Sequence, residues 1–180
     1  LAPDHSGARA AVDIALWDIE GKRLGVPVHR LLGGAQRDRL KVYASHWLSG
    51  VRQPELAAEG AREAIRRGYH GFKFIPVTHE GLCHDEAGEI RRATELMAAA
   101  REGAGPDAEI YIECSEFLSP RTAIMLDEAL RPYRPAWFEE PIPYENAAAM
   151  VALQGQIRTP IATGERLLTR FEFRELLERG

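Results

Sequence analysis

The sequence contains few of the features that mark secreted, membrane-spanning or nucleic-acid-binding proteins. Only two of its 180 residues are cysteine, Cys83 and Cys114. Two are too few for a disulfide framework, so a reducing cytoplasm is the expected compartment. No apolar run approaches the roughly 18 residues that a membrane helix needs, and no basic stripe carries interleaved aromatic residues. Neither a membrane nor a nucleic acid is therefore expected as a partner.

Several catalytic and cofactor motifs are also missing. The six histidines form no HExxH motif and there is no CxxC pair, which argues against a zinc site. There is no GxGxxG turn and no GxxxxGK[ST] loop, which argues against a nucleotide-binding fold. Residues 1–4 have neither a signal-peptide pattern nor an initiator methionine. We therefore expect the sequence to begin inside a longer product or after processing.

A regular alternation of two kinds of segment is present instead. Apolar residues recur at helical spacing from Val12 to Ile19, which predicts a first helix. After it, short β-rich runs alternate five times with longer amphipathic stretches. The expected strands are 40–44, 71–75, 109–113, 136–139 and 160–163. The expected helices are about 54–67, 86–102, 120–131, 145–154 and 170–179.

This alternation predicts an α/β fold. Strands that alternate with helices are typical of parallel sheets with right-handed crossovers. Since the nucleotide-binding turn is missing, a TIM (β/α) barrel is favoured over a doubly wound sheet. A full barrel has eight strands, so the sequence predicts a partial TIM barrel of about five βα units preceded by a helix. We divide it into a helical lead-in at 1–38 and a partial barrel at 39–180.

An acidic residue stands at the end of each of the last three expected strands. Glu139 follows Glu113 by 26 residues, and Glu165 follows Glu139 by the same interval. Because one βα unit separates neighbours, the three carboxylates would lie at one level on strands roughly 4.8 Å apart. Unpaired carboxylates repel one another, and a hard divalent cation such as magnesium relieves that repulsion. The alternative is that all three are solvated loop residues, which the repeated spacing disfavours.

Three segments of the sequence also resemble known motifs. Residues 8–34 read ARAAVDIALWDIEGKRLGVPVHRLLGG, residues 137–141 read WFEEP and residues 160–166 read PIATGER. Together they resemble the signatures of the mandelate racemase and muconate lactonising group of the enolase superfamily, in particular its acid-sugar dehydratases. The resemblance implies that Glu113, Glu139 and Glu165 bind Mg²⁺, with Glu140 in a supporting role. It also implies abstraction of the proton alpha to a carboxylate, with stabilisation of the resulting enediolate.

Some positions depart from the family pattern. Many relatives have Lys-x-Lys on the second strand, whereas this sequence keeps Lys73 and has Ile75 at the position of the base. Ser115 stands where relatives often have asparagine, histidine or lysine, and Glu113 replaces the commoner aspartate. The resemblance further implies a capping domain before Leu1 and a His-Asp dyad on later strands. We therefore expect the 180 residues alone to be inactive.

Four residues are candidates for contact with a substrate. Lys73 is the catalytic candidate, because it would contact the substrate carboxylate and stabilise the enediolate. Its alternative role is an ion pair with the neighbouring glutamates. The substrate-binding candidates are His46, Ser115 and Arg166. His46 has the alternative of a loop residue with a backbone partner, and Arg166 that of holding the ligand glutamates in place.

These observations predict a magnesium-dependent lyase that dehydrates a sugar acid. Two alternatives stay open at this point. One is a racemase or epimerase of the same superfamily, and the other is a non-catalytic fragment that retains the metal site. The expected partner is a small-molecule sugar acid or another carboxylate, and a homo-oligomer is expected.

Overall fold

The computed structural model describes residues 6–179, so residues 1–5, which begin the expected lead-in, and Gly180 lie outside the described part. The chain divides into two compact units, residues 1–41 and residues 42–180. The first unit contains α1 (Ser6–Leu24) and the short helix α2 (Val28–Leu31), which confirms the predicted first helix. No helix between residues 6 and 179 has the length and apolar character needed to cross a membrane.

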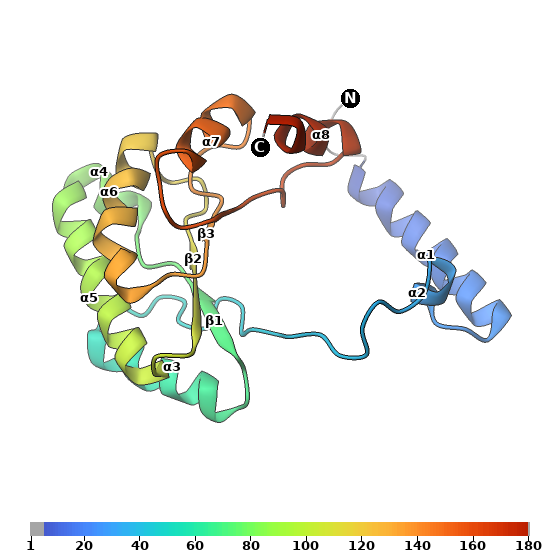
Figure 1. Ribbon diagram of the computed structural model, residues 1–180, viewed down its shortest axis with the longest axis horizontal. Coiled ribbons are helices and arrows are strands. Elements are labelled where there is room, and N and C mark those ends of the chain that lie inside the picture. Colours follow the sequence, from blue (N-terminus) through green and yellow to red (C-terminus); the bar gives the residue numbers. More distant parts are fainter. Residues whose placement is uncertain (1–5, 180) are drawn as a thin grey trace. The chain divides into compact units, whose positions relative to one another are not determined.

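The second unit is built on a parallel four-stranded sheet. Its strands are β1 (Gly71–Phe74), β2 (Glu109–Glu113), β3 (Phe138–Glu139) and β4 (Ile161–Ala162), and they lie side by side in chain order (Figure 1). All three strand pairs are parallel. This order is the one expected for consecutive βα units of a barrel wall, and it confirms the predicted α/β fold.

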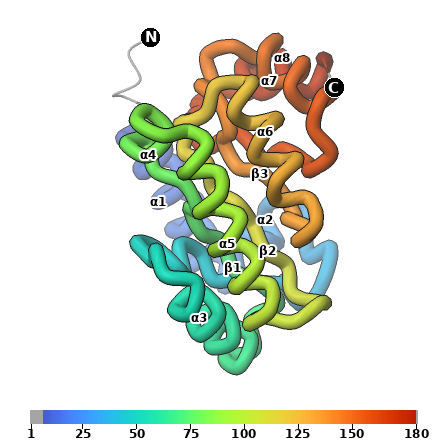
Figure 2. The backbone as a smooth tube through the Cα atoms, turned by 90° about the vertical axis from the view of Figure 1, so that its left-hand side faces the viewer, coloured from blue at the N-terminus to red at the C-terminus, as the bar shows by residue number. Residues whose placement is uncertain are grey.

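Helices connect the strands and cover one face of the sheet. The five predicted helices are all present, as α3 (Pro54–Arg66), α5 (Glu86–Ala104), α6 (Pro120–Leu130), α7 (Ala147–Gln154) and α8 (Arg170–Arg179). Figure 2 shows α3, α5, α6 and α7 following one another across this face. Helix α4 (His79–His84) and the 3₁₀ turn η2 (Arg131–Tyr133) were not predicted, because neither is long enough to show a helical period.

The prediction of a first strand at 40–44 is wrong. Only Ala44 pairs, through an isolated bridge to Phe72. The amide of Ala44 donates to the Gly71 carbonyl at 3.0 Å, and Gly71 is the first residue of β1. In this register residues 40–42 fall before the start of β1 and have no ladder to join. Leu40 and Val42 are accordingly exposed.

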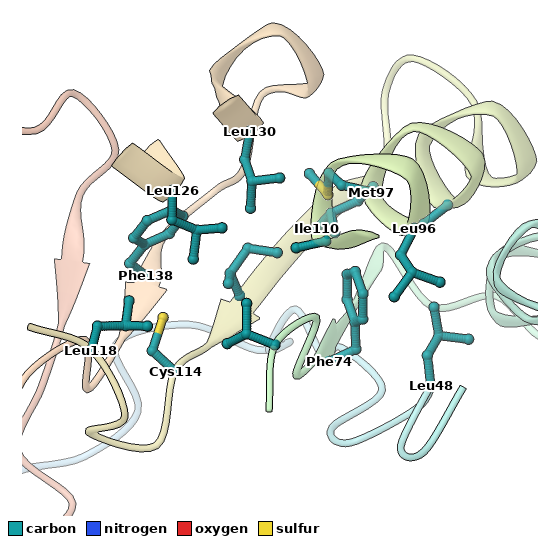
Figure 3. Packing of buried hydrophobic residues seen from close by; sticks show 14 of the residues in the cluster. Leu48, Phe74, Leu96, Met97, Ile110, Cys114, Leu118, Leu126, Leu130 and Phe138 are labelled. Atoms are coloured by element: carbon teal, nitrogen blue, oxygen red, sulfur yellow. The ribbon is translucent and has the colours of Figure 1, made fainter. Parts of the chain in front are cut away.

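The two faces of the sheet carry different side chains because residues alternate along a strand. Phe72, Phe74, Ile110, Ile112 and Phe138 are buried in the hydrophobic core. Figure 3 shows core side chains from the sheet and from the helices packed together, including Met97 and Leu126. The intervening residues of β1, β2 and β3 include Lys73, Tyr111, Glu113 and Glu139. These polar side chains point away from the helices, toward the side that would be the inside of a barrel.

Candidate active site

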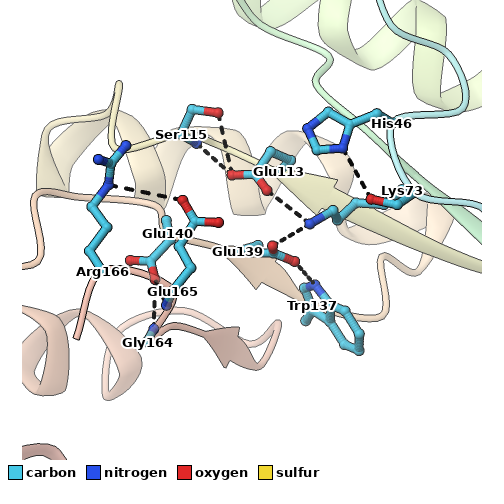
Figure 4. A network of polar contacts seen from close by, with 11 residues as sticks. His46, Lys73, Glu113, Ser115, Trp137, Glu139, Glu140, Gly164, Glu165 and Arg166 are labelled. Atoms are coloured by element: carbon cyan, nitrogen blue, oxygen red, sulfur yellow. Dashed lines mark hydrogen bonds and ion pairs between the residues drawn. The ribbon is translucent and has the colours of Figure 1, made fainter. Parts of the chain in front are cut away.

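Two of the three predicted ligand carboxylates lie side by side. Glu113 and Glu139 are register partners at the carboxyl ends of β2 and β3. Lys73 on β1 places its ammonium between them, with Nζ 3.0 Å from Glu113 Oε2 and hydrogen-bonded to Glu139 Oε1. Figure 4 shows these three side chains pointing toward one another. The strand ends therefore bring one cation and two anions together, as sequence spacing predicted for the carboxylates.

The three charged side chains are largely shielded from solvent, which strengthens the electrostatic interaction between them. The exposed fraction of the side chain is 6% for Lys73, 5% for Glu113 and 15% for Glu139. Burial by itself lowers the pKa of Lys73, but the hydrogen bonds to Glu139 and Glu113 outweigh it, so that the pKa is raised overall. Lys73 is consequently a stable ammonium ion. The ion pair, one of its two predicted roles, is present in the structure with both glutamates.

Each of the two carboxylates has a second donor that fixes its orientation. The backbone amide of Ser115 donates to Glu113 Oε1 at 2.9 Å, and the Ser115 hydroxyl lies 3.4 Å from the same oxygen. The indole N–H of Trp137 donates to Glu139 Oε2 at 3.0 Å. Ser115 thus holds a predicted ligand in place, while its contact with a substrate stays a prediction.

An aromatic layer lies against this cluster. The rings of Tyr111 and Trp137 have centroids 4.0 Å apart, and those of Tyr43 and Tyr111 are 4.6 Å apart. Tyr111 precedes Glu113 by two residues and Trp137 precedes Glu139 by two, so each ring shares a strand face with its carboxylate. The aromatic side chains therefore share the sheet face of the charged cluster, and the Trp137 indole contacts it directly.

Glu140 supports the loop that carries the third predicted ligand. Its carboxylate is almost fully buried and accepts hydrogen bonds from the Gly164 amide at 2.6 Å and the Glu165 amide at 3.2 Å. The Thr163 hydroxyl adds a third bond at 2.9 Å. Glu140 thus ties the end of β3 to the segment after β4, in agreement with the supporting role expected of it.

Glu165 itself is more exposed than the other two. Its side chain is 55% exposed, and the nearest cation is Arg166, whose Nε lies 4.0 Å away. Within residues 6–179, no three acidic, histidine or cysteine side chains are grouped closely enough to hold a metal ion. The structure therefore assembles two of the expected ligands around Lys73, and the three-ligand metal site stays a prediction.

The available donors nevertheless suit magnesium. Glu113, Glu139 and Glu165 offer only carboxylate oxygens, which are the ligands that a hard divalent cation prefers. Cys114, although next to Glu113, is fully buried in the core, and this burial raises the pKa of its thiol. Cys114 is therefore a buried apolar residue rather than a thiolate ligand.

Arg166 and His46, both predicted to bind substrate, each contact another side chain of the protein. Arg166 Nε lies 2.9 Å from Glu116 Oε2, which joins the segment after β4 to the segment after β2. His46 is exposed, and its Nδ1 lies 3.0 Å from the hydroxyl of Ser45. Their contact with a substrate stays a prediction.

Backbone strain is concentrated at this edge of the sheet. Four of the five non-glycine residues with positive φ among those described lie just after a strand or bridge: His46, Ser115, Glu116 and Glu140. Each such residue costs about 1–3 kcal/mol, and strain of this kind clusters at functional sites. Sequence reasoning gave no role to Trp137. A period of two in WFE would have placed Trp137 beside Glu139, whereas nothing local indicated the turn that positions Glu116.

Comparisons with known proteins agree with this geometry. Residues 56–180 match the family described as enolase C-terminal domain-like, and residues 3–33 match the N-terminal domain of mandelate racemase and muconate lactonizing enzymes. A D-galactonate dehydratase of Ralstonia nicotianae is 39% identical over 178 residues, which cover 99% of this chain and 46% of the relative. A D-gluconate dehydratase of Thermoproteus tenax is 38% identical over 179 residues, covering 98% of this chain and 35% of the relative. The chain thus spans less than half the length of these relatives.

Solved structures lead to the same family. A member of the enolase superfamily from Salmonella Typhimurium superimposes with a TM-score of 0.89 at 32% identity, covering 97% of this chain and 50% of that one. A mandelate racemase/muconate lactonizing enzyme from Sulfitobacter superimposes with a TM-score of 0.88 at 34% identity, covering 97% of this chain and 47% of that one.

Proposed function

The chain belongs to the mandelate racemase and muconate lactonizing enzyme group of the enolase superfamily, and from this premise we propose that it is the metal-binding part of a magnesium-dependent sugar-acid dehydratase. The observation that supports the proposal most directly is the convergence of Glu113 and Glu139 on Lys73 at the carboxyl ends of parallel strands. In barrels of this kind the active site lies at that end. The similar gluconate and galactonate dehydratases indicate the class of substrate.

The proposed reaction removes the proton alpha to the carboxylate of a sugar acid and releases the beta hydroxyl as water, so that a 2-keto-3-deoxy acid is formed. Glu113, Glu139 and Glu165 would hold Mg²⁺, which when bound supplies a positive charge that stabilises the enediolate. Lys73 would add its ammonium charge beside the substrate carboxylate. Ser115, His46 and Arg166 would contact the rest of the substrate.

Dehydration is favoured over racemisation by the residues that directly follow β1 and β2. Racemisation needs acid-base groups on both faces of the alpha carbon, but Ile75 cannot transfer a proton. Ser115 is engaged with Glu113 and is a poor base at neutral pH. A single histidine outside the strands described here would be enough for dehydration, because it could remove the alpha proton and then protonate the leaving hydroxyl. For that reason we also propose that residues 1–180 alone are inactive.

The test uses the whole protein that contains this chain, incubated with Mg²⁺, a panel of sugar acids and heavy water. We expect 2-keto-3-deoxy acids, detected as semicarbazones and by NMR. The Glu139→Gln variant should lose this activity, whereas Glu128→Gln, the same change on the exposed side of α6, should keep it. Deuterium exchange with inversion at the alpha carbon and no keto product would instead identify a racemase.

Three further expectations accompany this proposal. We propose a homo-oligomer in the cytoplasm that acts on a small-molecule carboxylate. The division at residue 38 between the lead-in and the partial barrel is likewise a proposal. Analytical ultracentrifugation of the whole protein would measure the oligomeric state.

A further inference from the structure

Glu116 has a buried oxygen with no hydrogen-bond donor. Glu116 Oε1 is the one buried side-chain nitrogen or oxygen among the described residues that has no partner. Native proteins satisfy the large majority of such atoms, because leaving a buried acceptor unpaired costs about 1–3 kcal/mol, and more when the group is charged. This carboxylate oxygen therefore lacks a donor among the described residues, and because 17% of the Glu116 side chain is exposed, a donor from outside them can reach the side chain.

The surroundings of Glu116 place this oxygen at the candidate active site. Its backbone amide donates to the Glu140 carbonyl at 2.7 Å, at the end of β3. Its other carboxylate oxygen pairs with Arg166, which follows Glu165. Glu116 itself comes three residues after Glu113. It is consequently held among the carboxyl ends of β2, β3 and β4.

The backbone at this position is held in an unfavourable conformation. Ser115 and Glu116 are consecutive residues with φ of 49° and 63°, in the left-handed region that favours glycine. Two hydrogen bonds maintain the turn. The Ser115 amide donates to the Glu113 carboxylate, and the Glu116 amide donates to the Glu140 carbonyl. The strained backbone of this turn therefore places the Glu116 side chain at this edge of the sheet.

On the basis of the proposed function, we propose that Glu116 is a specificity-determining residue that accepts a hydrogen bond from a hydroxyl of the sugar acid. A hydroxyl is a donor that an ionised carboxylate binds in a short, charge-assisted hydrogen bond. The carboxylate of the substrate would be repelled by Glu116 and attracted by Lys73. The sugar acid therefore lies with its carboxylate toward Lys73 on β1 and a distal hydroxyl toward Glu116 and Arg166.

The experiment measures the coupling between Glu116 and one substrate hydroxyl in binding affinity. Binding of six-carbon aldonates and of their 4-, 5- and 6-deoxy analogues to the whole protein with Mg²⁺ is measured by calorimetry. We expect one deoxy analogue to bind about 10- to 100-fold more weakly than its parent. In Glu116→Gln that ratio should fall to within about threefold, because the parent loses affinity while the analogue does not. Glu128→Gln, the same change on the exposed side of α6, should keep the wild-type ratio.

Other results overturn the inference. If Glu116→Gln weakens the parent and all analogues by one factor, the residue only holds Arg166 in place. If the wild type binds all analogues like their parents, or binds no aldonate, Glu116 recognises no hydroxyl. Should Glu116→Gln fail to fold, Glu116→Asp keeps the charge for Arg166, and the same loss confined to the parent is expected. Aldonates that bind with the expected pattern but are not dehydrated would refute the proposed reaction and leave this contact standing.

Discussion

Replacement of Lys73 by methionine tests the charge balance on which the candidate site depends. Methionine keeps the length and apolar volume of the side chain but removes the ammonium ion. Glu113 and Glu139 would then face each other without a cation, on neighbouring strands about 4.8 Å apart. With an effective dielectric constant near 20, two unit charges at about 5 Å repel by roughly 3 kcal/mol.

The burial of the three side chains makes this cost visible in stability. Removing one partner of a buried ion pair destabilises a protein by about 3–5 kcal/mol, because the remaining charge stays buried. We therefore expect the Lys73→Met variant of the whole protein, with a chelator present, to lose about 3–5 kcal/mol in free energy of unfolding. Urea denaturation followed by circular dichroism measures it. Lys22→Met is the matched control, since Lys22 is exposed and pairs with Asp18 on the surface of α1.

Added magnesium sharpens the test. A cation bound by the carboxylates would replace the missing ammonium charge, so the variant should gain more stability from Mg²⁺ than the wild type does. At a concentration 100 times the dissociation constant the gain is about 2.7 kcal/mol. A variant as stable as the wild type in the chelator would refute the reasoning, because it would mean that Lys73 does not balance these carboxylates.

Three further predictions concern residues in or near the candidate site. Trp137→Phe keeps the ring but removes the donor to Glu139, so affinity for Mn²⁺ or Mg²⁺ measured by titration should fall about 10-fold. Cys83 is exposed, whereas Cys114 is buried and its burial raises the pKa of the thiol, so a thiol reagent at pH 8 should label Cys83 but not Cys114 until the protein is unfolded. Glu89→Ala should cost about 3–5 kcal/mol in urea denaturation, because this fully buried carboxylate pairs with two arginines and holds the loop after β1.

Each of these has a result that would contradict it. Unchanged metal affinity in Trp137→Phe, or an equal loss in Trp17→Phe on α1, would show that the indole bond does not orient a ligand. Labelling of both thiols in the native protein would mean that Cys114 is accessible. A Glu89→Ala variant with wild-type stability would mean that the loop after β1 is anchored by other contacts.

Local sequence signals were sufficient to predict the longer helices. Pro54 and Pro120 begin α3 and α6, and Thr169 and Glu172 exchange the hydrogen bonds of a capping box before α8. These signals depend on residues within one turn of each other, so they can be read directly from the chain. The strand at 40–44 could not be judged in this way, since a β-rich run becomes a strand only where a neighbouring strand is opposite it.

The candidate site was partly determined by the sequence. The repeated interval placed Glu113 and Glu139 at equivalent strand ends, because each βα unit returns the chain to the same edge of the sheet. Only the tertiary structure decided that both carboxylates share Lys73, and that Glu165 remains at the edge beside Arg166. Those outcomes depend on strand register and on the reach of each side chain.

The same distinction applies to the residue on which the substrate-recognition proposal rests. The sequence by itself determined the order of strands and helices and the positions of the acids, because helical period, caps and turn residues act over a few neighbouring residues. Only the tertiary structure decided which of those acids is left with an unpaired oxygen. The state of Glu116 depends on Glu140 and Arg166, which lie on later βα units and come close only when the strands pair.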